Sequence, residues 1–193
     1  LAIKEVALGD EHPSTATSVY NLADLLQDKG DYDAAEPLHR RALAIREVAL
    51  RPGHPDTGTS MGNLARLLEA KGDYDAAEPL YCRALAIREE GLGLGHPATA
   101  TSVSNLAGLL GTMGDYAAAE PLHRRALAVE QETLGLNHPT TATSMNNLAG
   151  LLDAKGDYDA AEPLHRRALA IREAALGDEH PDTATSVNNL GSL

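Results

Sequence analysis

The sequence contains no Phe and no Trp, and its only aromatic residues are six Tyr. The bulky aromatic and β-branched residues that favour β-strands are therefore scarce, and the apolar content consists mainly of Leu and Ala, which favour helices. Hydrophobic residues still make up 43% of the 193 positions, which is enough for a substantial core. The composition predicts an all-α protein.

Positive charge is also scarce. The chain has 28 acidic and 16 basic residues, which gives a formal net charge of −12. No Lys/Arg cluster is larger than an Arg-Arg pair, so the basic face with which nucleic-acid-binding proteins neutralise phosphates is missing. An anionic membrane surface would be repelled for the same reason. We therefore expect neither nucleic acid nor a membrane as a partner.

Features of secreted, membrane-spanning and catalytic proteins are missing as well. The single cysteine, Cys82, cannot form an internal disulfide, so a cytoplasmic location is expected. No apolar run approaches the roughly 18 residues of a membrane span. Neither a phosphate-binding loop nor a calcium loop is present, and Cys82 has no unique base nearby in the sequence to activate it. We expect no catalytic residues, no bound metal and no cofactor.

What the sequence does contain is a repeat. The segment "GDYDAAEPL" begins at Gly30, Gly72 and Gly156, and a near copy, "GDYAAAEPL", begins at Gly114. Successive copies are 42 residues apart. A fixed period of about 20–50 residues predicts a solenoid, in which each unit buries its hydrophobic face by stacking on its neighbours.

Each repeat is expected to form two antiparallel helices. In residues 13–54, Pro13 suits the first turn of a helix, and Gly30 is a natural C-terminal stop. A second helix follows, capped by either Asp31 or Asp33. One repeat domain is thus predicted over 1–193, with the boundaries 1–12 (partial second helix), 13–54, 55–96, 97–138, 139–180 and 181–193 (partial first helix). Because the chain starts at Leu1 and ends within a repeat, it is interpreted as part of a longer protein.

The faces of the helices follow from a rotation of about 100° per residue. On the first helix this places Leu22, Leu25 and Leu26 toward the core, and it places the polar residues Tyr20, Asp24, Gln27 and Asp28 outward. On the second helix the expected buried stripe is Ala35, Leu38, Ala42, Leu43 and Ile45. Arg46 is expected to be solvated.

These residues resemble a known family. The order Leu22-Ala23, Gly30, Tyr32, Ala35 and Ala42-Leu43 is similar to the tetratricopeptide repeat pattern. The 42-residue period and the "HP", "NLA" and "ALAIRE" segments resemble the kinesin light chain type, which also occurs in bacterial multidomain proteins. The resemblance implies a right-handed α-solenoid of antiparallel helix pairs whose first helices line a concave groove. It also implies that His39, His123 and His165, which share a position with Tyr81, are partly buried structural residues.

The repeats differ from one another mainly on one surface. Repeats 13–54 and 139–180 share 32 of 42 residues. Four of the ten differences fall on the outward face of the first helix, at Tyr20/Asn146, Asp24/Gly150, Gln27/Asp153 and Asp28/Ala154. Repeats that share their packing residues but vary on one surface indicate a binding groove at that surface. Neutral drift at solvated positions would also produce such a pattern.

One polar residue recurs at the same place in every first helix: Asn21, Asn63, Asn105, Asn147 and Asn189. A side-chain amide offers both a donor and an acceptor, so it could pair with the main chain of an extended peptide of any sequence. It could equally bond a neighbouring helix and maintain the repeat spacing. The candidate peptide-binding residues are Asn21, Asn63, Asn105, Asn147, Tyr20, Asp24, Arg66, Glu69 and Asn146. Kinesin light chain grooves use several Lys and Arg to hold acidic cargo, but only Arg66 is present here, so an acidic ligand is not expected.

The predicted function is a non-catalytic scaffold that binds an extended peptide or a partner helix in the groove. One alternative is head-to-tail self-assembly through the open ends at 1–9 and 181–193. A further alternative is a sensor region that regulates an effector domain elsewhere in a longer protein.

Overall fold

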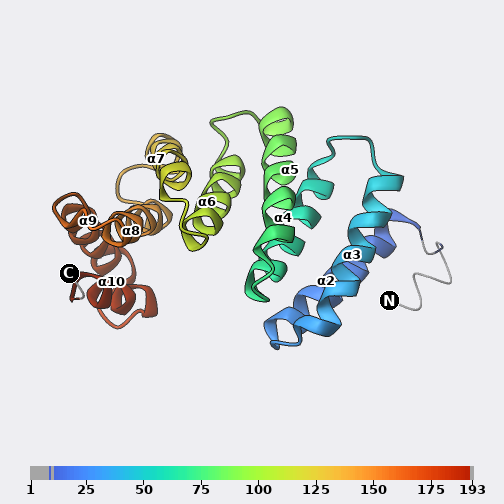
Figure 1. Ribbon diagram of the computed structural model, residues 1–193, viewed down its shortest axis with the longest axis horizontal. Coiled ribbons are helices and arrows are strands. Elements are labelled where there is room, and N and C mark those ends of the chain that lie inside the picture. The colour runs from blue at the N-terminus through green and yellow to red at the C-terminus, as the bar shows by residue number, and fades with distance from the viewer. Residues whose placement is uncertain (1–8, 10, 192–193) are drawn as a thin grey trace. The chain divides into compact units, whose positions relative to one another are not determined.

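The computed structural model describes residue 9 and residues 11–191, and every regular element within them is an α-helix (Figure 1). The chain divides into two compact units, Leu1–Gly93 and Leu94–Leu193. Residues 1–8, 10, 192 and 193 lie outside the described part of the chain, and with them most of the partial second helix predicted for 1–12.

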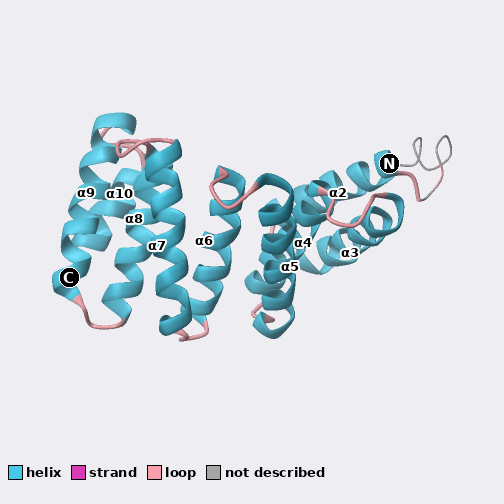
Figure 2. Cartoon of the chain, turned by 90° about the horizontal axis from the view of Figure 1, so that it is seen from above, coloured by secondary structure: helices cyan, strands magenta, loops and turns pink. Residues whose placement is uncertain are grey.

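Both units are built from antiparallel helix pairs joined by short loops (Figure 2). The first unit contains α2 (Pro13–Asp28), α3 (Tyr32–Ala49), α4 (Pro55–Ala70) and α5 (Tyr74–Leu92). The second contains α6 (Pro97–Thr112), α7 (Tyr116–Thr133), α8 (Pro139–Ala154), α9 (Tyr158–Leu176) and α10 (Pro181–Gly191). In each unit the second helix of one pair packs on the first helix of the next, as α3 does on α4 and α7 on α8.

Each first helix is started by the His-Pro dipeptide. The Nδ1 atom of His12 accepts a hydrogen bond from the backbone N–H of Ser14 at 3.1 Å, and the proline behind it occupies the first helical position. The same bond forms at His54, His96, His138 and His180, at 3.1 Å each. These five histidines are therefore helix caps.

The turn between the two helices of a pair also repeats. Gly30 has φ +79°, which lets Asp31 N–H reach the carbonyl of Leu26 at 2.9 Å and close the end of α2. The Asp31 carboxylate then accepts from Ala34 N–H at 3.2 Å. Of the two aspartates considered from the sequence, Asp31 and not Asp33 caps the second helix.

The outward face predicted for the first helix needs correction in α2. Leu22 and Leu25 are 37% and 50% exposed, whereas Val19, Ala23 and Gln27 are buried. The small residues of α2 face α3, its principal described neighbour, and this turns the leucine face away. In α4, which packs on both α3 and α5, the equivalent leucines are buried as predicted: Leu64, Leu67 and Leu68.

Arg46 is also not solvated as predicted. Its side chain is only 6% exposed, and its Nη1 donates to the Asp56 carbonyl at 3.1 Å and to the Ser60 hydroxyl at 2.7 Å. Arg172 makes the equivalent bonds to the first turns of α10, at 2.9 Å to Asp182 O and 2.9 Å to Ser186 Oγ. This arginine joins the second helix of one repeat to the first helix of the next.

Candidate functional site

Tyr20 and Asn63 link the first helices of unit 1. The amide nitrogen of Asn63 on α4 donates to the Tyr20 hydroxyl on α2. The Tyr20 ring is edge-on to His39, with centroids 5.8 Å apart, and the Arg46 guanidinium lies 5.3 Å from its centre. Burial raises the pKa of Tyr20, which keeps the phenol neutral. Asn63 thus bonds a neighbouring helix, as the spacing hypothesis for the asparagines requires.

Asp24 and Arg66 form a second link between α2 and α4. Arg66 Nη2 lies 3.5 Å from Asp24 Oδ1, and both side chains remain substantially exposed. An exposed pair at this distance adds little stability, so either charge can turn to a ligand. Glu69, further along α4, accepts from the Tyr81 hydroxyl of α5 at 2.7 Å and is half-buried. Together with Tyr20 and Asn63, these residues give unit 1 a polar first-helix face.

Asn146 does not lie on the outward face where the sequence placed it. It is 6% exposed; its Nδ2 donates to Ser186 Oγ at 2.8 Å and its Oδ1 is 2.9 Å from His165 Nδ1. The polar partners on α9 and α10 draw the short amide inward. The larger tyrosine at the same repeat position in α2 stays half-buried.

The recurring asparagines lie in both units. Asn21 and Asn147 are exposed, and Asn63, Asn105 and Asn189 are half-buried. The structure therefore brings Tyr20, Asp24, Asn63 and Arg66 together in unit 1, while Asn105 and Asn147 belong to unit 2.

The residues equivalent to Tyr81 are buried, as the resemblance implied: His39, His123 and His165. Burial lowers the pKa of His39 and of His123, so the neutral imidazole is favoured at each. His39 Nε2 is 3.2 Å from Gln27 Oε1, a partner that the sequence placed on the outer face.

The recurrence of a serine at positions 18, 60, 102, 144 and 186 was the available signal for the buried arginine bonds.

Reactive chemistry has little support in the described residues. No three His, Cys, Asp or Glu residues among them are grouped closely enough to hold a metal ion. Cys82 is exposed, but partial burial and the charge of Glu78 raise the pKa of its thiol. An activated cysteine nucleophile has a lowered pKa instead. None of the described helices is sufficiently long and apolar to cross a bilayer.

The repeat geometry agrees with a comparison of the sequence with known families. The Tetratricopeptide repeat model matches residues 1–47, 14–90, 98–174 and 146–193. The chain belongs to the tetratricopeptide repeat family. None of the curated proteins compared with it matches the sequence.

Solved tetratricopeptide arrays of the kinesin light chain type are similar in structure. BtubC (BKLC) from P. vanneervenii has a TM-score of 0.81 and 33% identity over 93% of this chain and 72% of its own. The putative kinesin light chain of Podosopora anserina, with nearly identical TPR-like repeats, has a TM-score of 0.80 and 30% identity over 94% of this chain and 86% of its own. The predicted all-α solenoid of kinesin light chain-type tetratricopeptide repeats is confirmed. Tetratricopeptide repeats are in general protein-interaction modules.

Proposed function

We propose that the chain is a non-catalytic scaffold and that the first helices of each unit bind an extended peptide or a partner helix. The observation that carries this proposal is the recurring asparagine: Asn21 and Asn147 are exposed, and Asn63 and Asn105 are half-buried, beside leucines that are buried in α4 and α8. Each unit thus offers side-chain amides at the repeat spacing on an otherwise variable face.

The spacing suits an extended ligand. Packed helices lie roughly 10 Å apart, and an extended chain rises about 3.3 Å per residue. Within one unit, one amide would therefore meet about every third residue of a bound peptide. In unit 1 the exposed charges of Asp24 and Arg66 lie on the same two helices and would contribute specificity for the ligand's side chains.

Replacement of Asn63, Asn105 and Asn147 by Ala is expected to weaken peptide binding about tenfold or more, because each amide that pairs with a peptide backbone contributes roughly 0.5–1.5 kcal/mol. Binders are selected from a random peptide library against the unaltered chain, and their affinities for both proteins are measured by titration calorimetry. A triple variant on the second helices, Arg40, Arg124 and Arg166 to Ala, is the control and should bind like the parent. Equal binding by all three proteins would assign the asparagines to repeat spacing alone.

A second candidate function is head-to-tail self-association. It is favoured by exposed apolar side chains on the terminal described helices: Leu22 and Leu25 on α2, and Val187 on α10. Different patches on the two ends would give contacts that do not close into a ring. The sedimentation coefficient is then expected to rise with concentration, and Leu25→Ser should suppress that rise. A coefficient that stays at the monomer value at high concentration would remove this candidate.

A further inference from the structure

The loop between α3 and α4 departs from the other inter-repeat loops. Elsewhere the first loop residue is a glycine with positive φ: Gly9, Gly93, Gly135 and Gly177. Here Arg51 stands in that place. Thr141 Oγ1 donates to the carbonyl of Gly135 at 2.9 Å, and Thr183 Oγ1 donates to that of Gly177 at 2.8 Å. The buried hydroxyl oxygen of Thr57, at the same position in α4, has no partner within the described residues.

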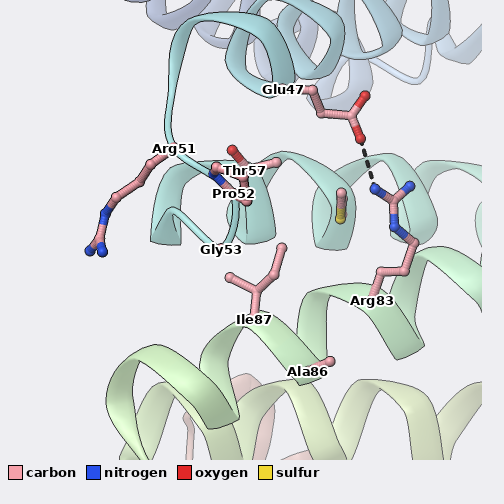
Figure 3. Close-up of a pocket in the computed structure, with 9 residues that line it drawn as sticks. Glu47, Arg51, Pro52, Gly53, Thr57, Arg83, Ala86 and Ile87 are labelled. Atoms are coloured by element: carbon pink, nitrogen blue, oxygen red, sulfur yellow. Dashed lines mark hydrogen bonds and ion pairs between the residues drawn. The ribbon is translucent and has the colours of Figure 1, made fainter.

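A pocket of about 400 Å³ lies beside Thr57 (Figure 3). Its walls combine apolar side chains with the charged residues Glu47, Arg51 and Arg83. Glu47 and Arg83 are paired with each other at 2.9 Å, and Figure 3 shows the Arg51 side chain pointing away. The pocket therefore favours no particular ligand.

The helix α6 departs from the other first helices in a way that does indicate a ligand. In the other complete repeats, a side-chain oxygen near the end of the first helix meets the buried ring at the position of Tyr81 on the second helix. These pairs are Gln27 Oε1 and His39 Nε2 at 3.2 Å, Glu69 Oε2 and the Tyr81 hydroxyl at 2.7 Å, and Asp153 Oδ2 and His165 Nε2 at 2.8 Å. The residue at this position of α6 is Gly111, which has no side chain to offer.

His123, the equivalent ring on α7, is left without this bond. It is 4% exposed and makes no hydrogen bond to the rest of the described chain. Its Nδ1 is enclosed without a partner, as is the Nδ1 of His39. Its Nε2 is not enclosed, so a group from outside can reach that nitrogen. His123 thus differs from His39 in lacking the oxygen that Gln27 supplies, and a buried ring in this state points to a missing acceptor.

The surface of α6 beside this ring has room for such a group. Gly108 lies one turn before Gly111 on the same face, and a Cβ built on it would meet no atom within 4 Å. A Cβ on Gly111 would lie 3.3 Å from Leu151 Cδ1, so this leucine of α8 forms an apolar wall. The position of Gly108 is occupied by longer side chains in unit 1, those of Asp24 and Arg66. The two glycines therefore leave an opening where the first helices of unit 1 carry side chains.

The charges around the opening distinguish between the possible oxygen acceptors. Between Pro97 and Thr112, α6 has no charged residue, and the only charged residue of α8 is Asp153. Burial lowers the pKa of His123, so its ring is a neutral donor. A carboxylate would therefore be desolvated without a cation, whereas a carboxamide oxygen carries no charge to desolvate.

We propose that this opening binds a glutamine or asparagine side chain of a partner peptide. The carboxamide oxygen would accept a hydrogen bond from His123 Nε2–H, in the manner of Gln27 and His39. Asn105 on the same helix would hold the peptide backbone beside it. The proposal rests on the peptide-binding function proposed for the first helices, and it adds a residue preference to that function.

The probes for this site are the N-acetyl, N-methylamide derivatives of glutamine, methionine and glutamate. They share one backbone and have side chains of similar length, with an amide oxygen, no oxygen acceptor and a carboxylate, respectively. The imidazole signals of the ¹⁵N-labelled histidines are recorded by NMR, and His123→Tyr, which copies the residue of the second repeat, assigns the His123 signal. We expect the glutamine probe to shift His123 Nε2 with a dissociation constant on the order of 10 mM, about fivefold tighter than the methionine probe. The glutamate probe should bind more weakly than the glutamine probe.

Two glycine variants test the place of the missing side chain. Gly111→Gln supplies a carboxamide from within the chain, so it should move the His123 Nε2 signal toward that of His39 and abolish the shift caused by the glutamine probe. Gly150→Gln is the matched control, because Gly150 is an exposed glycine on the neighbouring first helix. It should leave both the His123 signal and the binding of the probe unchanged.

The proposal is overturned if the glutamine probe does not shift His123 at about 100 mM, if the methionine or glutamate probe binds as tightly, or if Gly111→Gln still binds the glutamine probe. Library peptides that depend on the asparagines but show no preference for Gln or Asn would overturn this proposal alone. The capped amino acids need no other contact with the first helices. A shift of His123 by the glutamine probe without any binding of library peptides would therefore support the site and contradict the function proposed for the whole face.

Discussion

Replacement of Arg46 by Ala is expected to lower the free energy of unfolding of unit 1 by about 3 kcal/mol. The guanidinium donates to Asp56 O and Ser60 Oγ at 3.1 and 2.7 Å, and hydrogen bonds from a charged donor are stronger than neutral ones. Its removal also uncovers the Tyr20 ring and leaves the buried Ser60 hydroxyl without this donor. Urea denaturation followed by circular dichroism measures the loss.

Arg40→Ala provides the matched control on the same helix. Arg40 is exposed and pairs only with Glu36 one turn earlier, so its loss should change the free energy of unfolding by less than about 0.5 kcal/mol. Similar effects of the two substitutions would show that the buried bonds of Arg46 are not what joins α3 to α4. Arg46→Lys should be intermediate, because a single ammonium retains the charge but not the planar donor group.

Replacement of Glu130 by Gln is expected to stabilise unit 2 by about 1–3 kcal/mol at pH 8. Glu130 occupies on α7 the repeat position of Arg46 and Arg172, and it is 3% exposed. The Ser144 hydroxyl donates to its carboxylate, and one carboxylate oxygen has no partner within the described residues. Burial raises the pKa of Glu130 above the ordinary 4.5, an effect that Ser144 and His138 only partly oppose.

The raised pKa fixes the pH dependence of this effect. A carboxyl whose folded-state pKa exceeds its unfolded-state value favours folding while it is protonated, and that contribution is lost as the pH rises through the folded-state pKa. The difference between Glu130→Gln and the parent should therefore be small below pH 4.5 and reach its full size above the folded-state pKa. Urea titrations at several pH values measure it. Glu132→Gln, an exposed change on the same helix, is the control and should alter the free energy of unfolding by less than about 0.5 kcal/mol at pH 8. A constant effect of Glu130→Gln across pH would contradict the assignment.

Local signals in the sequence were sufficient for the helices and their ends. Proline at the first position and a positive-φ glycine at the turn act within a few residues of where they stand, so α2 begins at Pro13 and ends just before Gly30 as predicted. The family resemblance added the stacking of the pairs, which the solved relatives confirm.

Side chains whose partners lie in another helix were placed less well. Rotation around a single helix puts Arg46 and Asn146 on polar faces, but the acceptors that bury them, Ser60 and Ser186, belong to the following repeat. The leucines of α2 show the same limit, because a helix face is buried only where a neighbouring helix covers it. The pocket beside Thr57 was missed for a similar reason, since one altered loop leaves a threonine six residues away without the loop carbonyl that its equivalents bond.

The residue at the repeat position of Arg46 also determines which junction between neighbouring repeats of unit 2 is weaker. In a solenoid each repeat is coupled to its neighbours only, so the array is as cooperative as its weakest junction. The α9–α10 junction has the Arg172 bonds, whereas the α7–α8 junction has in their place the buried Glu130 carboxyl, one oxygen of which has no partner within the described residues. Under mechanical tension, α7 and α8 would therefore separate before α9 and α10. Glu130 would make the α7–α8 junction the first of the two to fail.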